Sequence, residues 1–269
     1  MTYTTSPQSH ASLTVADGVV RVTITRPDKR NAISPEVTDL LWTAARRLRD
    51  DDAARVMVIA AEGKYFTAGI DLATGGPGAY ATTLPQQRRE YREHHLLYDE
   101  LEAIEKPVVM AIQGPCLGAG VEMSVSCDFR LAARSATFGL PEIQLGVIPG
   151  SGGVSRLTRL VGPHWAKWLA MADMRIDAER ALAIGLVHDV HDDEDFAGAV
   201  DRFVERLVSL PPEALGVAKL TIDMVAEVDR RTARDVERIA NSPLVLGGEF
   251  RRRLEAFQTR SASRGGGRS

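Results

Sequence analysis

The 269-residue chain has few of the residues that mark a disulfide scaffold, a membrane protein or a nucleic-acid-binding protein. Its two cysteines, Cys116 and Cys127, form neither a Cys-x-x-Cys pair nor a four-ligand zinc site, so we expect buried thiols and no metal centre. No apolar run reaches the roughly 18 residues of a membrane span. The 33 basic and 36 acidic residues give a net charge of -3, which argues against nucleic acid and anionic membranes as partners. The polar residues 1–12 resemble no signal peptide, so the cytoplasm is the expected location.

Hydrophobic periodicity predicts an α/β chain whose order is strands, then alternating strands and helices, then helices. Residues 20–24 alternate apolar and polar side chains, as a half-buried strand does. Ser34-Pro35-Glu36 predicts a helix start, with a capping hydroxyl, a proline in the first turn and an acid at the positive end of the dipole. The apolar runs 56–61 and 107–112 predict buried strands, and 86–105 predicts a long amphipathic helix.

The pattern changes after about residue 195, where strands stop. Residues 196–208 and 212–228 have helical patterns and predict an appendage able to pack against another subunit. We therefore divide the chain into a core, 1–195, and a helical C-terminal region, 196–269. Only Arg, Ser, Ala and Gly occur in the last ten residues, which predicts a flexible tail from about 260.

Two glycine-rich corners follow the predicted buried strands, FTAGID at 66–71 and GAGVE at 118–122. Small residues in such turns let backbone N–H groups approach a ligand, and a helix N-terminus adds positive potential. If they face each other, the two corners can hold a developing oxyanion. Tight strand-to-helix turns with no ligand explain the same spacing.

Two glutamates stand beside these corners. Glu122 lies just inside the helix expected after the second corner, and Glu142 belongs to a strand expected to return beside that helix. A carboxylate pair in an apolar cleft has at least one raised pKa, which suits general acid and base catalysis. Helix-end or surface acids are the alternative interpretation. The residues alone therefore give a candidate pair.

Several motifs follow one another in a fixed order between about residues 13 and 225. They are PDKRNAI (27–33), FTAGIDL (66–72), KPVV (106–109), GAGVE (118–122), CD (127–128) and FGLPEIQLGVIPGSGG (138–153). In sequence and order they resemble the crotonase (enoyl-CoA hydratase/isomerase) family. The resemblance implies a crotonase-type spiral of ββα units with two near-perpendicular sheets and a helical C-terminal appendage. It also implies an acyl-CoA substrate and a homotrimer or dimer of trimers.

The resemblance also implies binding roles. The backbone N–H groups of Ile70 and Ala119 match the two donors that hold the thioester oxygen. Coenzyme A would lie near Arg30 and the backbone of Ala68 and Asp71.

Four places depart from the family pattern. Ile70 stands where Ala or Ser is common, which narrows the pocket, and Ala119 stands where Gly is common, a change that a backbone donor tolerates. Ala73 replaces a lysine often found after the first corner. Arg252-Arg253 stands where Glu-Gly is common, so the C-terminal third resembles the family least.

The chemistry implied is that of an enoyl-CoA hydratase-type lyase. Like the hydratase branch, the chain has glutamates at both Glu122 and Glu142, and Gly150 would leave room for the water. Coenzyme A is part of the substrate, and no further cofactor is expected. The alternatives are an enoyl-CoA isomerase or other enolate chemistry on a specialised CoA ester. An alternative of another class is a non-catalytic acyl-CoA- or RNA-binding protein of the same fold.

Other residues that invite a catalytic interpretation fit one poorly. Ser151 is no nucleophile of the Gly-x-Ser-x-Gly type, because Pro149 stands where the first glycine belongs. His188 and His191 have no clear third metal ligand. Gly114, Gly118 and Gly120 lack the spacing of a dinucleotide-binding turn.

Overall fold

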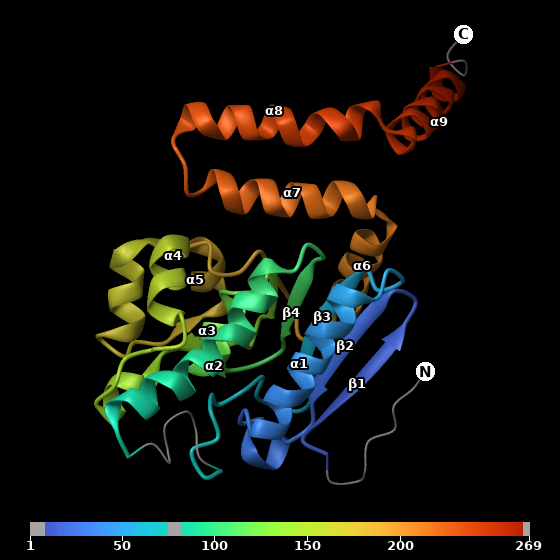
Figure 1. Ribbon diagram of the computed structural model, residues 1–269. Helices are drawn as coiled ribbons and strands as arrows, with labels where there is room; N and C mark the ends of the chain where they lie inside the picture. Colours follow the sequence, from blue (N-terminus) through green and yellow to red (C-terminus); the bar gives the residue numbers. More distant parts are fainter. Residues whose placement is uncertain (1–8, 75–81, 266–269) are drawn as a thin grey trace. The chain divides into compact units, whose positions relative to one another are not determined.

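Figure 1 shows the computed structural model, which describes residues 9–74 and 82–265. The chain forms two compact units, Met1–Val208 and Ser209–Ser269. Among the described residues, no helix combines the length and the apolar character needed to cross a membrane. The mixed α/β character expected from the sequence is confirmed.

A six-stranded sheet forms the centre of the first unit. Its order is β1 (Ala11–Ala16), β2 (Val19–Ile24), β3 (Val56–Ala61), β4 (Val108–Ile112), β6 (Phe129–Ala133) and β9 (Asp189–His191). Only the β1–β2 pair is antiparallel, and the other described pairs of this sheet are parallel. Asp17 and Gly18 both have positive φ angles (51° and 79°) in the turn between β1 and β2, as a tight two-residue hairpin requires.

A second, smaller sheet lies beyond the carboxyl ends of the central strands. It consists of β5 (Cys116–Leu117), β7 (Thr137–Gly139) and β8 (Ile176–Asp177). Isolated bridges join Thr67 to Cys116 and Ile33 to Ile70. These bridges connect the first glycine corner to segments that lie far from it in the sequence.

Helices of the first unit connect these strands. They are α1 (Pro35–Asp50), α2 (Leu84–Ala103), α3 (Ala119–Ser124), α4 (Gly153–Ala170), α5 (Ala178–Ala183) and α6 (Phe196–Ser209), with 3-10 turns η1 (Pro27–Lys29) and η2 (Pro141–Leu145). The predicted start of α1 is confirmed, because the Ser34 hydroxyl accepts a hydrogen bond from the Val37 N–H. Almost all of α6 lies in the first unit, with Phe196, Val200 and Val204 buried, so the division falls after this helix and not near residue 195.

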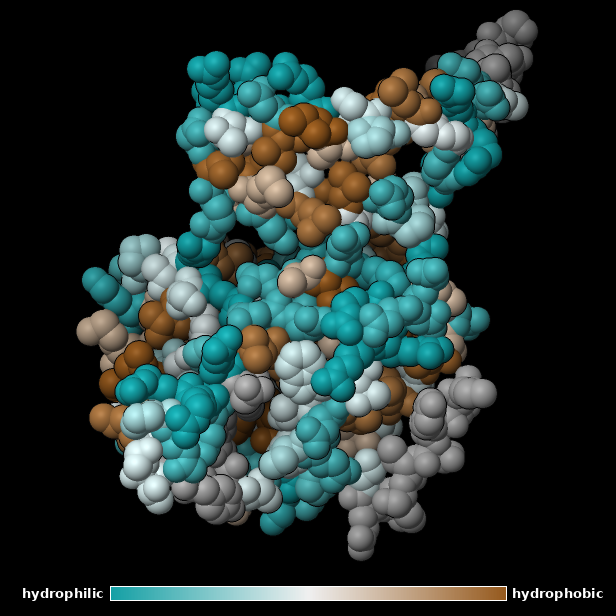
Figure 2. Space-filling view, in the orientation of Figure 1, coloured by the Kyte–Doolittle hydropathy of each residue, from teal (hydrophilic) through white to brown (hydrophobic). Residues whose placement is uncertain are grey.

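The second unit consists of α7 (Pro212–Val225), α8 (Arg230–Leu246) and α9 (Gly248–Gly265). The helix predicted at 212–228 is confirmed and ends three residues early. Helix α9 continues to Gly265, past the expected start of the flexible tail, and residues 266–269 lie outside the described residues. Figure 2 shows apolar side chains, in brown, over α7 and α8.

Candidate active site

The two glycine corners meet in the structure. Gly69 has a φ of 95°, which a glycine adopts easily. A Cβ built on Gly69 would lie 3.1 Å from the Leu117 carbonyl oxygen and 3.5 Å from the Ala119 nitrogen. The close approach of the two corners therefore depends on the absence of a side chain at this position.

Both predicted oxyanion donors have free N–H groups within the described part of the chain. The Ile33 N–H donates to Gly69 O and the Asp71 N–H donates to Ile33 O, each at 2.9 Å. Because neighbouring peptides of an extended segment point in opposite directions, the Ile70 N–H faces away from Ile33. Ala119 is the first residue of α3. The N–H groups in the first turn of a helix have no intrahelical carbonyl to bind, so the Ala119 N–H is available to a ligand.

Hydrogen bonds from neighbouring elements fix both ends of α3. At its start, the buried Tyr98 hydroxyl donates to the Ala119 carbonyl at 3.2 Å. At its end, the buried Arg130 guanidinium donates to Ser124 O at 2.9 Å and to Cys127 O at 2.6 Å. A cation is favourable beside the carbonyl end of a helix. The peptide of Ala119 and the side chains of α3 are thus held in a defined position.

Glu122 is 4% exposed on α3. Its Oε1 accepts a hydrogen bond from the Ser151 N–H at 2.7 Å. Burial raises the pKa of Glu122 to about 7, the negative charge of Glu142 adds to the rise, and hydrogen bonds from the Ser151 and Gly153 backbones oppose it. This carboxyl therefore exchanges its proton near neutral pH, as a general acid or base must.

Glu142 lies in η2, a 3-10 turn, so its expected place on a returning strand is wrong. A Cβ built on Gly118 would lie 2.9 Å from the Glu142 Oε1, which places this carboxylate beside the oxyanion corners. Its Oε2 is buried and has no hydrogen-bond partner within the described residues. Burial, followed by the negative charge of Asp173, raises the pKa of Glu142. An unpaired buried oxygen is costly unless a ligand or water binds it.

These groups line one cavity of about 540 Å³. Six of the residues predicted from the sequence line it, namely Ala68, Ile70, Ala119, Glu122, Glu142 and Gly150. Aliphatic side chains form much of the remaining wall, including Leu145, Val147 and Ile148. The cavity therefore combines an apolar wall with two carboxyl groups and two free backbone donors.

The structure places two predicted coenzyme A residues outside this cavity lining. Arg30 is exposed, and its guanidinium lies 5.5 Å from the centre of the Tyr65 ring. Asp71 is buried, and its carboxylate forms a 2.8 Å ion pair with Arg26. The N–H groups of Ala68 and Asp71 already donate to Arg30 O and Ile33 O, so coenzyme A would meet the carbonyl oxygens there.

Two groups at the cavity were not predicted from the sequence, the Tyr91 side chain and the Ser151 N–H. Tyr91 on α2 lines it, and a Cβ built on Gly150 would lie only 2.7 Å from the Tyr91 Cε1. Gly150 thus makes room for the Tyr91 ring. Ser151 contributes its backbone N–H to Glu122. The seven-residue spacing of Tyr91 and Tyr98, which places both on one face of a helix, is the signal that the sequence offered.

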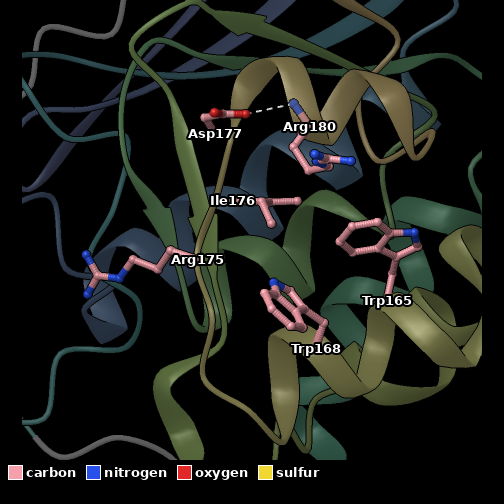
Figure 3. A pocket seen from close by; sticks show the side chains of 6 residues that line it. All are labelled: Trp165, Trp168, Arg175, Ile176, Asp177 and Arg180. Carbon is pink, nitrogen blue, oxygen red and sulfur yellow. Dashed lines mark hydrogen bonds between the residues drawn. The ribbon is translucent and has the colours of Figure 1, made fainter.

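A second cavity of about 390 Å³ lies between α4, β8 and the start of α5. Figure 3 shows Trp165, Trp168 and Ile176 around it, while the Arg175 side chain points away from the tryptophans. The Arg180 guanidinium lies 5.6 Å from the centre of the Trp165 ring, and Asp177 accepts a hydrogen bond from the Arg180 N–H. This lining has no pair of carboxyl groups. Nowhere in the described ranges do three or more potential metal ligands gather.

Comparison with known proteins shows the family of this chain. The profile of the enoyl-CoA hydratase/isomerase family matches residues 14–258. The chain therefore belongs to this family, and its fold is the crotonase fold that the motifs predicted.

Individual relatives are similar to this chain over most of their own length. Crotonyl-CoA hydratase from Syntrophomonas wolfei is 36% identical over 219 residues, which cover 80% of this chain and 81% of that protein. An enoyl-CoA isomerase/hydratase from Mycosarcoma maydis is 33% identical over 94% of this chain and 93% of its own. The crystal structure of an enoyl-CoA hydratase from Bacillus anthracis superposes with a TM-score of 0.85 at 31% identity, covering 93% of this chain and 96% of that one.

Proposed function

We propose that this protein is an enoyl-CoA hydratase-type lyase, which adds water across the 2,3 double bond of an enoyl-CoA thioester and catalyses the reverse dehydration. One observation carries the proposal: the buried Glu122 carboxyl, the half-buried Glu142 carboxyl and two backbone N–H groups that are free within the described residues line the same apolar cavity. Relatives named for crotonyl-CoA and short-chain enoyl-CoA hydration support it.

In this mechanism the thioester oxygen accepts hydrogen bonds from the N–H groups of Ile70 and Ala119. The water oxygen bonds to Cβ, and one water proton passes to a carboxylate of the Glu122–Glu142 pair. The electrons of the double bond move toward the thioester and form an enolate, whose charge the two N–H groups stabilise. Each such donor is typically worth about 10²- to 10³-fold in rate. Glu142 then delivers a proton to Cα, so the net change is the addition of one water molecule.

The protonation state expected of the two carboxyl groups fits this scheme. Hydration needs one carboxylate to accept a proton from water and one carboxylic acid to supply a proton to Cα. A pair with raised pKa values, of which that of Glu122 is about 7, exists partly in this singly protonated form near neutral pH. No further cofactor enters the scheme, because coenzyme A arrives with the substrate.

Substrate binding extends the proposal beyond the reacting atoms. Leu145, Val147 and Ile148 supply an aliphatic wall for the acyl group. Arg30 supplies an exposed cation for the coenzyme A phosphates, which matters because Ala73 stands where family members often carry a lysine.

Assembly and location complete the proposal. In the C-terminal unit Ile222, Ile239, Leu246 and Phe257 are each more than 60% exposed, as expected of helices that pack against another copy. We infer a homotrimer or a dimer of trimers in the cytoplasm. Light scattering after size-exclusion chromatography measures the assembly, and a monodisperse monomer would contradict it.

The test is the loss of enoyl-thioester absorbance with crotonyl-CoA and with longer enoyl-CoAs. Hydration by the parent protein and its loss in Glu142→Gln would support the proposal. Absence of hydration at every chain length, with intact acyl-CoA binding, would support a non-catalytic acyl-CoA-binding role instead. A 3-enoyl-CoA in the same assay tests isomerase activity, which the similarity to the Mycosarcoma maydis isomerase/hydratase favours as a second candidate.

A further inference from the structure

Tyr91 is held with its hydroxyl beside the turn that follows Glu142. A Cβ built on Gly150 would lie 2.7 Å from its Cε1 and 3.2 Å from its hydroxyl oxygen. The half-buried ring and the His95 ring form a T-shaped pair, with 5.7 Å between ring centres and 85° between ring planes. The contacts with Gly150 and His95 place the hydroxyl beside Gly150.

The same turn binds Glu122. Its Oε1 accepts the Ser151 N–H at 2.7 Å, and a Cβ built on Gly153 would lie 2.8 Å from this oxygen. The Tyr91 hydroxyl and the Glu122 carboxyl therefore lie beside the same four-residue segment, 150–153. Burial, with the negative charges of Glu122 and Glu142, raises the pKa of Tyr91, so its hydroxyl keeps its proton at neutral pH.

The hydroxyl supplies a donor that the carboxyl pair does not spare. The ionised carboxylate only accepts hydrogen bonds, and the proton of the carboxylic acid is assigned to Cα, whereas the attacking water has a lone pair that a further donor can bind. The N–H groups of Ile70 and Ala119 are assigned to the thioester oxygen. Tyr91 lines the cavity, and within the described part of the chain its hydroxyl makes no hydrogen bond.

We propose that Tyr91 is a further catalytic residue, whose hydroxyl donates a hydrogen bond to the oxygen that joins Cβ. It binds this oxygen first as the attacking water and then as the 3-hydroxyl group of the product. The proposal rests on the hydratase function proposed above. It predicts that the site distinguishes a 3-hydroxyacyl-CoA from the matching saturated acyl-CoA through this one hydroxyl.

The binding experiment compares two ligands that differ by one oxygen, 3-hydroxybutyryl-CoA and butyryl-CoA. Calorimetric titration uses Glu142→Gln protein, in which turnover is blocked, with Tyr91 either intact or changed to Phe. Phenylalanine keeps the ring contacts with Gly150 and His95. We expect Tyr91→Phe to weaken 3-hydroxybutyryl-CoA binding by about tenfold, the effect of one hydrogen bond, and to leave butyryl-CoA binding unchanged.

Tyr65→Phe is the matched control, because it removes a phenol hydroxyl outside the cavity lining and keeps the ring beneath Arg30. It should leave the ratio of the two affinities unchanged. Equal weakening of both ligands by Tyr91→Phe, or no change in either, would overturn the proposal and leave the ring as a wall of the acyl pocket.

Kinetics separates this proposal from the proposed function. With Glu142 intact, Tyr91→Phe should lower kcat for crotonyl-CoA hydration about tenfold with little change in KM. A parent protein that hydrates no enoyl-CoA would refute the proposed function, while the affinity ratio would still report whether Tyr91 binds the hydroxyl. A parent that hydrates crotonyl-CoA beside a Tyr91→Phe variant with unchanged kcat would refute the role of Tyr91 alone.

Discussion

The cavity of the two glutamates and the cavity of the two tryptophans lie in the same unit, and both combine apolar walls with charged residues. They differ in how their polar groups are paired. In the tryptophan cavity, Asp177 caps a helix and Arg180 lies over an aromatic ring. In the glutamate cavity, a buried oxygen of Glu142 has no hydrogen-bond partner among the residues that the structure describes. Hydrogen-bonding capacity left open inside a folded protein marks the cavity built for a reacting ligand.

The largest effect is expected from Glu142→Gln. The amide keeps the size of the side chain but neither gives nor takes the Cα proton, so hydration of crotonyl-CoA should fall about 10³-fold or more. The initial rate of absorbance loss measures it. Thermal unfolding close to that of the parent is the control, and a rate within tenfold of the parent would remove Glu142 from the mechanism.

Glu122→Gln should have the next largest effect. The Gln oxygen still accepts the Ser151 N–H, but the side chain no longer takes a proton from water, so hydration should fall about 10²- to 10³-fold. Isomerisation of a 3-enoyl-CoA, which needs one base, should be less affected. Assays of both reactions on one preparation test this, and equal retention of hydration would contradict a role for Glu122.

The pH dependence of stability should report the buried charge of Glu122. Its pKa is raised from 4.5 to about 7, so the folded state binds this proton more tightly than the unfolded state. The resulting stability is fully present below the unfolded pKa of 4.5 and is lost as pH rises through about 7. At about 1.4 kcal/mol per pKa unit, the full loss is on the order of 3 to 4 kcal/mol.

Urea unfolding at several pH values measures this contribution as the difference between the parent and Glu122→Gln. As pH rises from about 4.5 to about 8, the unfolding free energy of the parent should fall relative to that of Glu122→Gln. A difference that does not vary with pH would show that Glu122 titrates alike in both states.

Gly150→Ala should lower the hydration rate less than the glutamate variants do, and it should act by displacing Tyr91. The new methyl group would lie 2.7 Å from the Tyr91 Cε1, so the ring must move. If its hydroxyl acts as proposed, kcat for hydration should fall about tenfold, close to the effect of Tyr91→Phe. The double variant provides the check, since the two losses should not add. Fully additive losses would show that Gly150 acts independently of the hydroxyl.

Trp168→Ala should have the smallest effect on catalysis. This side chain is 41% exposed and lies in the other cavity, so kcat and KM for crotonyl-CoA should stay within about twofold of the parent. Steady-state kinetics beside the glutamate variants tests the contrast between the two cavities directly. A large fall in kcat in a variant that assembles like the parent would show that the tryptophan cavity also contributes to catalysis.

The sequence predicted those features that depend on local pattern. Strand alternation, the Ser34 cap and the glycine corners each follow from short segments, and the structure confirms them. Family motifs then brought Glu122 and Glu142 together, which spacing alone left open.

Other features depended on contacts across the fold. Tyr91 reads in the sequence as one more apolar residue of an amphipathic helix, because its role depends on a contact with Gly150 nearly 60 positions away. The side chain of Asp71 is engaged with Arg26, an ion pair that no local pattern indicates. The boundary of the first unit moved past α6 because its apolar face packs into that unit.

The contact between Gly69 and Leu117 has a consequence for how such a catalyst diversifies. In the proposed mechanism main-chain atoms supply both anion-binding hydrogens, so their spacing depends on the bare Cα of Gly69 and not on the side chains at positions 70 and 119. Those two side chains are therefore open to replacement by larger or smaller groups. Replacing them would change which acyl groups the cavity accepts and would leave the two proposed donors in place.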